Sequence, residues 1–225
     1  MVDMKNKLEI LYEDNHIIVV IKPINVLSQG DSTNDLDMVN IIKSYLKEKY
    51  NKPGNVYVGL VHRLDRPTGG IMVFAKTSKA ASRLCKSISD GVFSKNYLAV
   101  VSNFNKKSGT LCDYLKKDSN NNSVVTKKED GKYSVLNYEV IKKIDNLSLV
   151  KIELITGRHH QIRVQFASRG YPLYGDQRYG KSDRKQLALY AYRLEFIHPV
   201  KKEKMIFERF PKYGIFRKFG DLNER

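Results

Sequence analysis

The stretch from Gly59 to Gly70, GLVHRLDRPTGG, places side chains suited to chemistry directly after an apolar run. Its single carboxylate, Asp65, lies between Arg63 and Arg66, and Pro67 and the two glycines predict a turn. Scaffolds commonly present functional groups where a strand ends in a loop. Two interpretations are open. Asp65 does chemistry, or it ties the turn together by accepting backbone N–H groups and pairing with an arginine.

A second polar stretch, TGRHHQIRVQFASRGYPLYGDQRYG, runs from residue 156 to residue 180. Its spacing predicts a helix from Arg158 to about Ser168, with Arg163 four residues after His159 on one face. Arg163 would then project from a rigid element toward another segment. The alternative is that Arg158, His159 and Arg163 form a solvated basic face that only contacts phosphate.

Apolar runs predict the strands that must position these side chains. The predicted strands are HIIVVIKP (16–23), NVYVGLV (55–61), GIMVFA (70–75), KNYLAVV (95–101), YSVLNYEVI (133–141), LSLVKIEL (147–154) and QLALYAYRLEFIHP (186–199).

Helical spacing predicts two further helices, Leu36–Tyr50 and Lys76–Asp90, the second ended by Gly91. The polar segment 119–130 is expected to be an exposed loop. Strands outnumber helices and do not alternate with them, which favours an α+β fold: a mixed, largely antiparallel sheet with flanking helices. We expect residues 1–225 to form a single domain of two lobes.

The charge of the chain predicts a polyanionic partner. Its 225 residues hold 40 Lys+Arg against 24 Asp+Glu, a formal charge of +16. Nucleic acid is the first candidate and an anionic membrane surface the second, while a generically soluble basic protein stays open. The basic residues do not gather on one amphipathic helix, which disfavours the membrane.

Cysteine usage and the lack of targeting signals indicate a cytoplasmic protein. Cys85 and Cys112 are too few for a disulfide framework, so a reducing compartment is expected. No CxxC or HxxxH spacing offers a zinc site, and no metal is predicted. The longest apolar run, IIVVI, is far too short to span a bilayer, and the start MVDMKNKLEI has no signal-peptide core.

Five motifs in order resemble those of the RluA-type RNA pseudouridine synthases. HRLDRPTGG resembles the family signature HRLDxxTSG, and GRHHQIRVQFASRGYPLYGD resembles GRTHQIRVHLAxxGHPIxGD. SKNYLAVV resembles its KxYLALV strand, while ILYEDNHIIVVIKP and QLALYAYRLEFIHP resemble its opening and closing strands. The resemblance covers about residues 8–210. It implies the subgroup without the small N-terminal RNA-binding domain of the S4 type, and the pseudouridine synthase fold.

The resemblance implies that uridine in ribosomal or transfer RNA is isomerised to pseudouridine without a cofactor. Asp65 matches the essential carboxylate, which would attack C1′ or C6 or assist loss of the 2′ proton. Tyr97 matches the tyrosine that stacks on the uracil, and Arg163 the arginine paired with the aspartate. Leu189 matches the apolar residue that lines the pocket. Arg63 matches the arginine that enters the helix where the flipped base left.

Physical chemistry fits these roles. A catalytic carboxylate must be ionised at neutral pH, and a nearby arginine favours the ionised form. A stacked uridine must be flipped out at a cost of a few kcal/mol. Stacking on an aromatic ring, worth about 1–3 kcal/mol per base, offsets that cost. No obligate protein partner is indicated, and a monomer that binds RNA and no membrane is expected.

Departures from the family pattern are few. The family threonine before HQIR is replaced by His159, and the KPxG turn reads Lys22-Pro23-Ile24-Asn25. Asn25 is expected to take the left-handed conformation that glycine would take. None of these changes touches Asp65, Tyr97 or Arg163.

The basic C-terminal stretch from Pro199 to Phe219 interleaves aromatic residues with lysines and arginines. It is either an RNA track or a terminal strand and helix packed by its aromatics.

Two other functions compete with the synthase. The first is a non-catalytic RNA-binding or ribosome-assembly protein on the same fold, against which Asp65, Tyr97 and Arg163 together argue. The second is a metal-dependent nuclease, which the lack of a carboxylate cluster disfavours.

Overall fold

The computed structural model describes residues 8–33, 35–181 and 184–222. The chain forms two compact units, Met1–Phe93 with Arg193–Arg209 (unit 1) and Ser94–Tyr192 with Phe210–Arg225 (unit 2). Residues 1–7, where the sequence predicts no signal-peptide core, lie outside the described residues.

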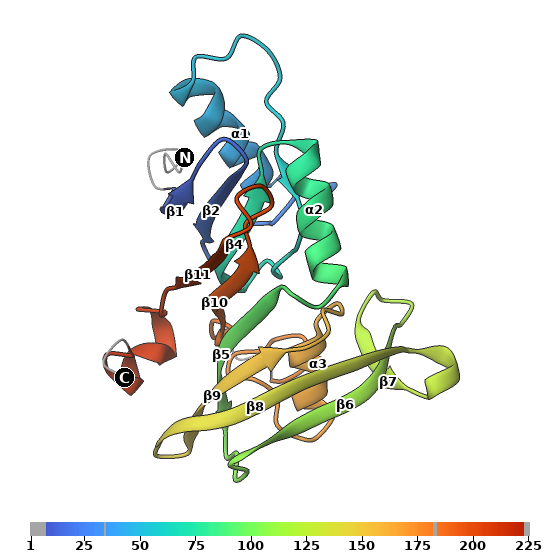
Figure 1. The fold of residues 1–225 in the computed structure, drawn as a ribbon. Helices are drawn as coiled ribbons and strands as arrows, with labels where there is room; N and C mark the ends of the chain where they lie inside the picture. The colour runs from blue at the N-terminus through green and yellow to red at the C-terminus, as the bar shows by residue number, and fades with distance from the viewer. Residues whose placement is uncertain (1–7, 34, 182–183, 223–225) are drawn as a thin grey trace. The chain divides into compact units, whose positions relative to one another are not determined.

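Unit 1 is built on an antiparallel arrangement of short strands (Figure 1). Strand β2 (Ile17–Lys22) pairs with β1 (Ile10–Glu13) on one side and with β4 (Gly69–Ala75) on the other. The short β3 (Gly59–Leu60) also pairs with β4, and β11 (Lys204–Glu208) pairs with the end of β10 (Leu189–Ile197). The Asp65 turn therefore connects β3 to β4.

The core of unit 1 forms because the β-branched runs of β2 and β4 are buried on both faces. Ile17, Val19, Ile71 and Val73 pack against α2 (Ser78–Ser89) and Phe196. Helix α1 (Met38–Lys49) begins at Asp37, whose side chain accepts the backbone N–H of Asn40. Such N-caps satisfy donors that the first helical turn leaves without partners.

Helix α1 is also held to the strands by the buried carboxylate of Glu13. It accepts hydrogen bonds from Tyr45 and Lys49 of α1, from Tyr50 at the C-cap of that helix, and from Lys76 after β4. Burial would raise the pKa of Glu13, but these donors lower it to about 2. The ionised carboxylate therefore connects β1, α1 and the end of β4.

Unit 2 is an antiparallel meander. Strand β5 (Ser94–Ser102) pairs with β9 (Leu147–Leu154), β9 with β8 (Lys132–Ile144), β8 with β6 (Ser108–Lys117), and β6 with β7 (Ser123–Thr126). Helix α3 (Gln161–Ala167) packs against β6 and β7 (Figure 1). The α+β class expected from the sequence, with a largely antiparallel sheet, is confirmed.

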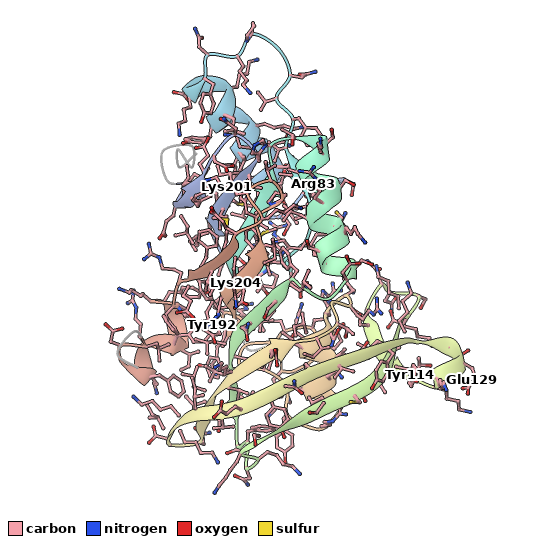
Figure 2. The ribbon with its side chains drawn as sticks, in the orientation of Figure 1. Arg83, Tyr114, Glu129, Tyr192, Lys201 and Lys204 are labelled. Atoms are coloured by element: carbon pink, nitrogen blue, oxygen red, sulfur yellow. The ribbon has the colours of Figure 1, made fainter. Side chains whose placement is uncertain are left out.

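Aromatic residues of the C-terminal stretch belong to the cores. Phe216 and Phe219, in the 3-10 segment η3 (Gly214–Phe219), are 1% and 0% exposed and pack on Leu98 and Leu149 of unit 2. Phe207 packs against the core of unit 1. Among the basic residues, Lys204 pairs with Glu195, and Lys201 donates to the Tyr12 hydroxyl; both lysines are labelled in Figure 2. This favours a packed terminus over an RNA track.

Several predicted boundaries are wrong. The first helix begins at Met38, which leaves Leu36 outside it and exposed, and only residues 59–60 of the predicted strand 55–61 form a strand. The expected loop 119–130 contains β7 and a 3-10 turn. The predicted helix 158–168 begins at Gln161, because His160 has a left-handed φ of 49°. His159 and Arg163 therefore do not share a helical face.

No helix within the described ranges is long and apolar enough to cross a membrane.

Candidate active site

The Asp65 turn in unit 1 is closed by a hydrogen bond from the Thr68 N–H to the Asp65 carbonyl, 2.9 Å long. Leu64 is 7% exposed, Asp65 is half-buried and Arg66 is exposed. The buried leucine anchors the turn from below, so that the neighbouring carboxylate lies at the surface of a fixed backbone.

On its N-terminal side the turn is held by Ser28. The Ser28 hydroxyl donates to the Leu64 carbonyl at 2.7 Å and accepts from the Leu64 N–H at 3.0 Å. Both backbone groups of the residue before Asp65 are thus satisfied by one buried side chain. Because a lost hydrogen bond here would leave buried backbone groups without partners, this contact resists movement of the turn.

On its C-terminal side the turn is held by the segment after β2. The Arg66 carbonyl accepts from the Asn25 N–H at 2.8 Å and from Lys22 Nζ at 3.1 Å. Asn25 has a φ of 63°, which confirms the left-handed conformation expected from the sequence. Asparagine tolerates this conformation better than most residues, and its N–H is thereby directed to the Asp65 turn.

Lys22 is a buried cation next to the carboxylate. Its side chain is fully buried, and Nζ also donates to the carbonyls of Pro23 (2.9 Å) and Val26 (2.5 Å). Burial lowers the pKa of Lys22 to about 7; the Asp65 carboxylate opposes this shift and Arg66 adds to it. The ammonium group therefore contributes both hydrogen bonds and attraction to the Asp65 turn.

The two arginines beside Asp65 contact other side chains. Arg63 Nη2 donates to Gln29 Oε1 at 2.9 Å, and Arg66 Nη1 pairs with Asp35 Oδ2 at 2.7 Å. Both guanidinium groups are exposed. These contacts weaken the interpretation in which Asp65 serves only to pair with Arg63 or Arg66.

Tyr97 and Leu189 lie on strands of unit 2. Tyr97, 6% exposed, pairs with Ile152 of β9 through the backbone, and Leu189, 4% exposed, begins β10. The strand backbone fixes both side chains at defined positions.

Arg163 is buried on α3 and is not part of a solvated basic face. It is 5% exposed, and it binds Asp176 through two hydrogen bonds, Nε to Oδ2 and Nη2 to Oδ1, each 2.8 Å. The Tyr179 ring lies 5.2 Å from the guanidinium carbon. A bidentate pair of this kind fixes the plane of the guanidinium group.

Asp176 is itself tightly held. Its carboxylate also accepts the backbone N–H groups of Arg178 (3.0 Å) and Tyr179 (3.1 Å). Burial would raise the pKa of Asp176, but the Arg163 guanidinium and these N–H groups hold it below its ordinary value. The carboxylate is therefore ionised wherever the protein is folded near neutral pH, and it balances the charge of Arg163.

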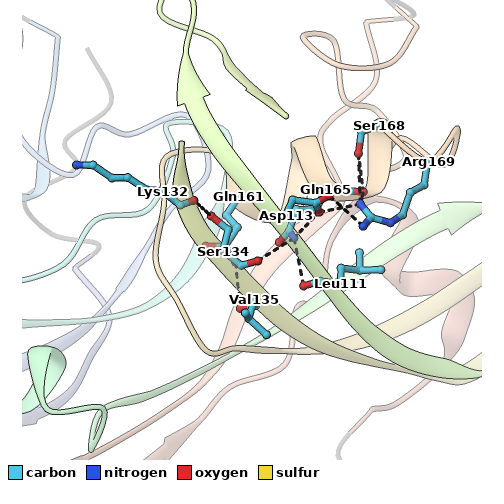
Figure 3. A network of polar contacts seen from close by, with 9 residues as sticks. All are labelled: Leu111, Asp113, Lys132, Ser134, Val135, Gln161, Gln165, Ser168 and Arg169. Atoms are coloured by element: carbon cyan, nitrogen blue, oxygen red, sulfur yellow. Dashed lines mark hydrogen bonds and ion pairs between the residues drawn. The ribbon is translucent and has the colours of Figure 1, made fainter. Parts of the chain in front are cut away.

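Two glutamines of α3 tie the helix to the sheet (Figure 3). Gln165 Nε2 donates to Asp113 Oδ2 at 2.7 Å and to the Leu111 carbonyl at 3.2 Å, both on β6. Gln161 Nε2 donates to the Val135 carbonyl of β8 at 3.1 Å. These contacts fix a helix of only seven residues, which would be unstable alone.

The structure thus divides the predicted site residues. Asp65 and Arg63 belong to unit 1, and Tyr97, Arg163 and Leu189 belong to unit 2. Sequence reasoning missed the supporting residues Lys22, Ser28 and Asp176. The KP dipeptide and the GD dipeptide were visible signals for two of them, whereas nothing in the sequence marks Ser28.

The family model described as RNA pseudouridylate synthase matches residues 16–168. The chain is 33% identical over 216 residues to the ribosomal large subunit pseudouridine synthase D of Zymomonas mobilis, covering 89% of this chain and 68% of the relative. It is 34% identical over 218 residues to an uncharacterized RNA pseudouridine synthase of Aquifex aeolicus, with the same coverages.

The solved structure of human RNA pseudouridylate synthase domain containing 4 has the same fold. Its TM-score with this chain is 0.79 at 20% identity, and the match covers 95% of this chain and 93% of that chain.

Proposed function

The chain belongs to the RNA pseudouridylate synthase family and is an RNA pseudouridine synthase, an isomerase, and we propose from this premise that Asp65 is its essential carboxylate. The observation that carries the proposal is the anchoring of the Asp65 turn. Ser28 holds the residue before the carboxylate, and Lys22 and Asn25 hold the residue after it. A side chain that only closed a turn would not need this support on both sides.

The reaction sets requirements that these residues meet. The N1–C1′ bond of uridine breaks, the uracil turns, and C5 bonds to C1′ while the C5 proton is lost and N1 gains one. Asp65 acts on the reacting nucleotide, and its carboxylate attracts the buried side chain of Lys22, which helps to hold the turn in place. Tyr97 stacks on the flipped uracil, Leu189 lines the apolar side of the pocket, and Arg163, fixed by Asp176, acts with the carboxylate.

The substrate in this proposal is ribosomal RNA of the large subunit. The support is that relatives at 31–33% identity from Zymomonas mobilis, Borreliella burgdorferi and Haemophilus influenzae are named for that substrate. The test is to map pseudouridines in ribosomal and transfer RNA from cells with and without this gene. Loss of specific sites in large-subunit RNA supports the proposal, and loss in transfer RNA alone replaces the substrate. An unchanged map leaves a non-catalytic RNA-binding role.

Arg63 is proposed as the residue that enters the RNA helix at the position that the flipped uridine has left. Its guanidinium is exposed and held by Gln29, so it can leave that contact to stack on bases. Arg63→Ala should slow single-turnover pseudouridine formation about tenfold or more in a structured stem-loop, and much less in a short flexible oligonucleotide. Equal losses on the two RNAs would assign Arg63 to the support of the carboxylate and exclude the opening of the stack.

The two units are proposed to act as one catalytic domain in a cytoplasmic monomer. The two cysteines, Cys85 and Cys112, are free and exposed, which suits a reducing compartment. Sedimentation of the purified protein with and without RNA tests the monomer.

A further inference from the structure

Lys95 lies on β5 two residues before Tyr97, so the two side chains point to the same face of the strand. Their backbone positions are about 7 Å apart at the usual rise of a strand. The Lys95 side chain is partly exposed. A molecule that reached Tyr97 from this face could therefore also reach the Lys95 ammonium.

The Lys95 ammonium has no hydrogen bond or ion pair with any residue in the described part of the chain. Burial alone lowers its pKa, and no carboxylate offsets that effect. Space next to the ammonium is kept by Gly157, where an added Cβ would lie 3.1 Å from Nζ. Lys95 thus differs from Lys22 and Arg163, which are surrounded by oxygen atoms of the protein.

A partly buried cation without a countercharge is costly, because the protein supplies neither water nor an anion to replace its hydration shell. The same arrangement becomes favourable when a ligand brings an anion. RNA carries one phosphate for every nucleotide, and lysine is an effective point charge for phosphate. We propose that Lys95 binds a backbone phosphate directly beside the nucleotide whose base stacks on Tyr97, an inference that rests on the function proposed above.

The test uses single-turnover modification and binding of a substrate RNA in which the phosphate on either side of the target uridine is replaced by a neutral methylphosphonate. For the wild type, one of the two replacements should weaken binding about tenfold, as expected for a lost charge-assisted hydrogen bond. Lys95→Met should weaken binding of unmodified RNA by a similar factor and should show no further loss with that methylphosphonate. If the loss of affinity from Lys95→Met and the loss from that methylphosphonate multiplied when combined, the two groups would act independently, and the proposal would be overturned.

Two further variants sharpen the test. Lys151→Met removes an exposed lysine from the neighbouring strand β9 and should retain the full methylphosphonate effect. Gly157→Ala keeps the charge but crowds the ammonium, and should weaken binding of unmodified RNA more than of the methylphosphonate RNA. If Lys151→Met also abolished the methylphosphonate effect, that effect would come from the net charge of the protein, which would contradict a phosphate site at Lys95. If the wild-type protein formed no pseudouridine in any of these RNAs, the proposed function would be refuted. The binding measurements would still report on the role of Lys95.

Discussion

Each unit holds a buried cation: Lys22 in unit 1 supports the predicted site residue Asp65, and Arg163 in unit 2 is itself a predicted site residue. The partners of the two cations differ. In unit 1, Lys22 is surrounded by backbone carbonyls of the segments that hold Asp65. In unit 2, Arg163 is bound by the carboxylate of Asp176. Lys22 can lose its proton near neutral pH, since burial lowers its pKa to about 7. Arginine stays charged at every pH at which proteins fold.

The difference indicates two ways to fix a functional group. A lysine among neutral acceptors connects loops by hydrogen bonds, and its contribution to the stability of the fold depends on pH. An arginine in a bidentate carboxylate pair fixes one side chain in orientation, independently of pH near neutrality. The comparison predicts that breaking the Arg163 ion pair in unit 2 costs much stability at any pH near neutrality. The stability lost by removing Lys22 from unit 1 should instead change with pH.

The largest effect is expected for Asp176→Asn. Removing one partner of a buried ion pair costs about 3–5 kcal/mol of unfolding free energy, because the remaining charge is left unbalanced. The loosened guanidinium should also slow pseudouridine formation. Urea unfolding at pH 7 and single-turnover tritium release from C5-labelled uridine RNA measure the two losses.

The matched control is Asp90→Asn, which removes the carboxylate that pairs with Lys86; both side chains are exposed, at 47% and 77%. An exposed pair of this kind is worth about 0–1 kcal/mol. If both variants lost the same stability, the Arg163–Asp176 pair would not be the buried anchor described here.

Lys22→Met should destabilise the protein by an amount that grows as the pH rises from 7 to 9. The folded protein releases the Lys22 proton near pH 7, whereas the unfolded chain keeps it to about pH 10.4. The unfolded state therefore binds more protons in this window, so Lys22 makes the wild type more stable as pH rises. The gap between wild type and variant should widen by about 2 kcal/mol across these two pH units.

Lys49→Met is the control for this experiment. Its hydrogen bond to Glu13 raises the pKa of Lys49, so the group is charged in both folded and unfolded chains between pH 7 and 9. The cost of that variant should not change with pH. A pH-independent cost for Lys22→Met would mean that its ammonium keeps its proton throughout, and the contrast between the two units would disappear.

The sequence predicted local structure where one strong local signal sets it. The β-branched run of β2, the Gly91 helix stop with φ 74°, and the left-handed Asn25 were all predicted correctly. It failed where a neighbour supplies the reason. Residues 123–126 lie within a polar segment of the sequence, and they form a strand because β6 pairs with them. The predicted helix starts late, at Gln161, because His160 before it is left-handed, and the His160 ring nitrogen contacts the Tyr179 hydroxyl, 19 residues away.

The site showed the same division. The residues named for chemistry came from motifs, and the motifs carried no information on their supports. Asp176 is 13 residues from Arg163 and Ser28 is 36 residues from Leu64, so both contacts arise only in the folded chain. Buried charge and hydrogen-bond satisfaction are tertiary properties, which one sequence does not display.

Ser28→Ala should cost less stability than Asp176→Asn, and it tests the uncharged hydrogen bonds that hold the Asp65 turn. It leaves the Leu64 N–H and carbonyl without their partner, at a cost of about 1–3 kcal/mol. Turnover should fall as well, because the turn carries Asp65. Ser148→Ala, which removes a buried hydroxyl that donates to Phe104 in unit 2, should cost similar stability without loss of turnover. Equal turnover in both serine variants would contradict the role of Ser28 in positioning the turn.

The central claim is that the Asp65 carboxylate performs chemistry and does not merely hold a turn. Asp65→Asn keeps the size of the side chain and one acceptor oxygen, and removes its charge. Tritium release from C5-labelled uridine RNA should fall by about 10³-fold or more, while RNA affinity in a filter-binding assay changes less than tenfold. Release near the wild-type rate, with affinity unchanged, would contradict the catalytic assignment of Asp65.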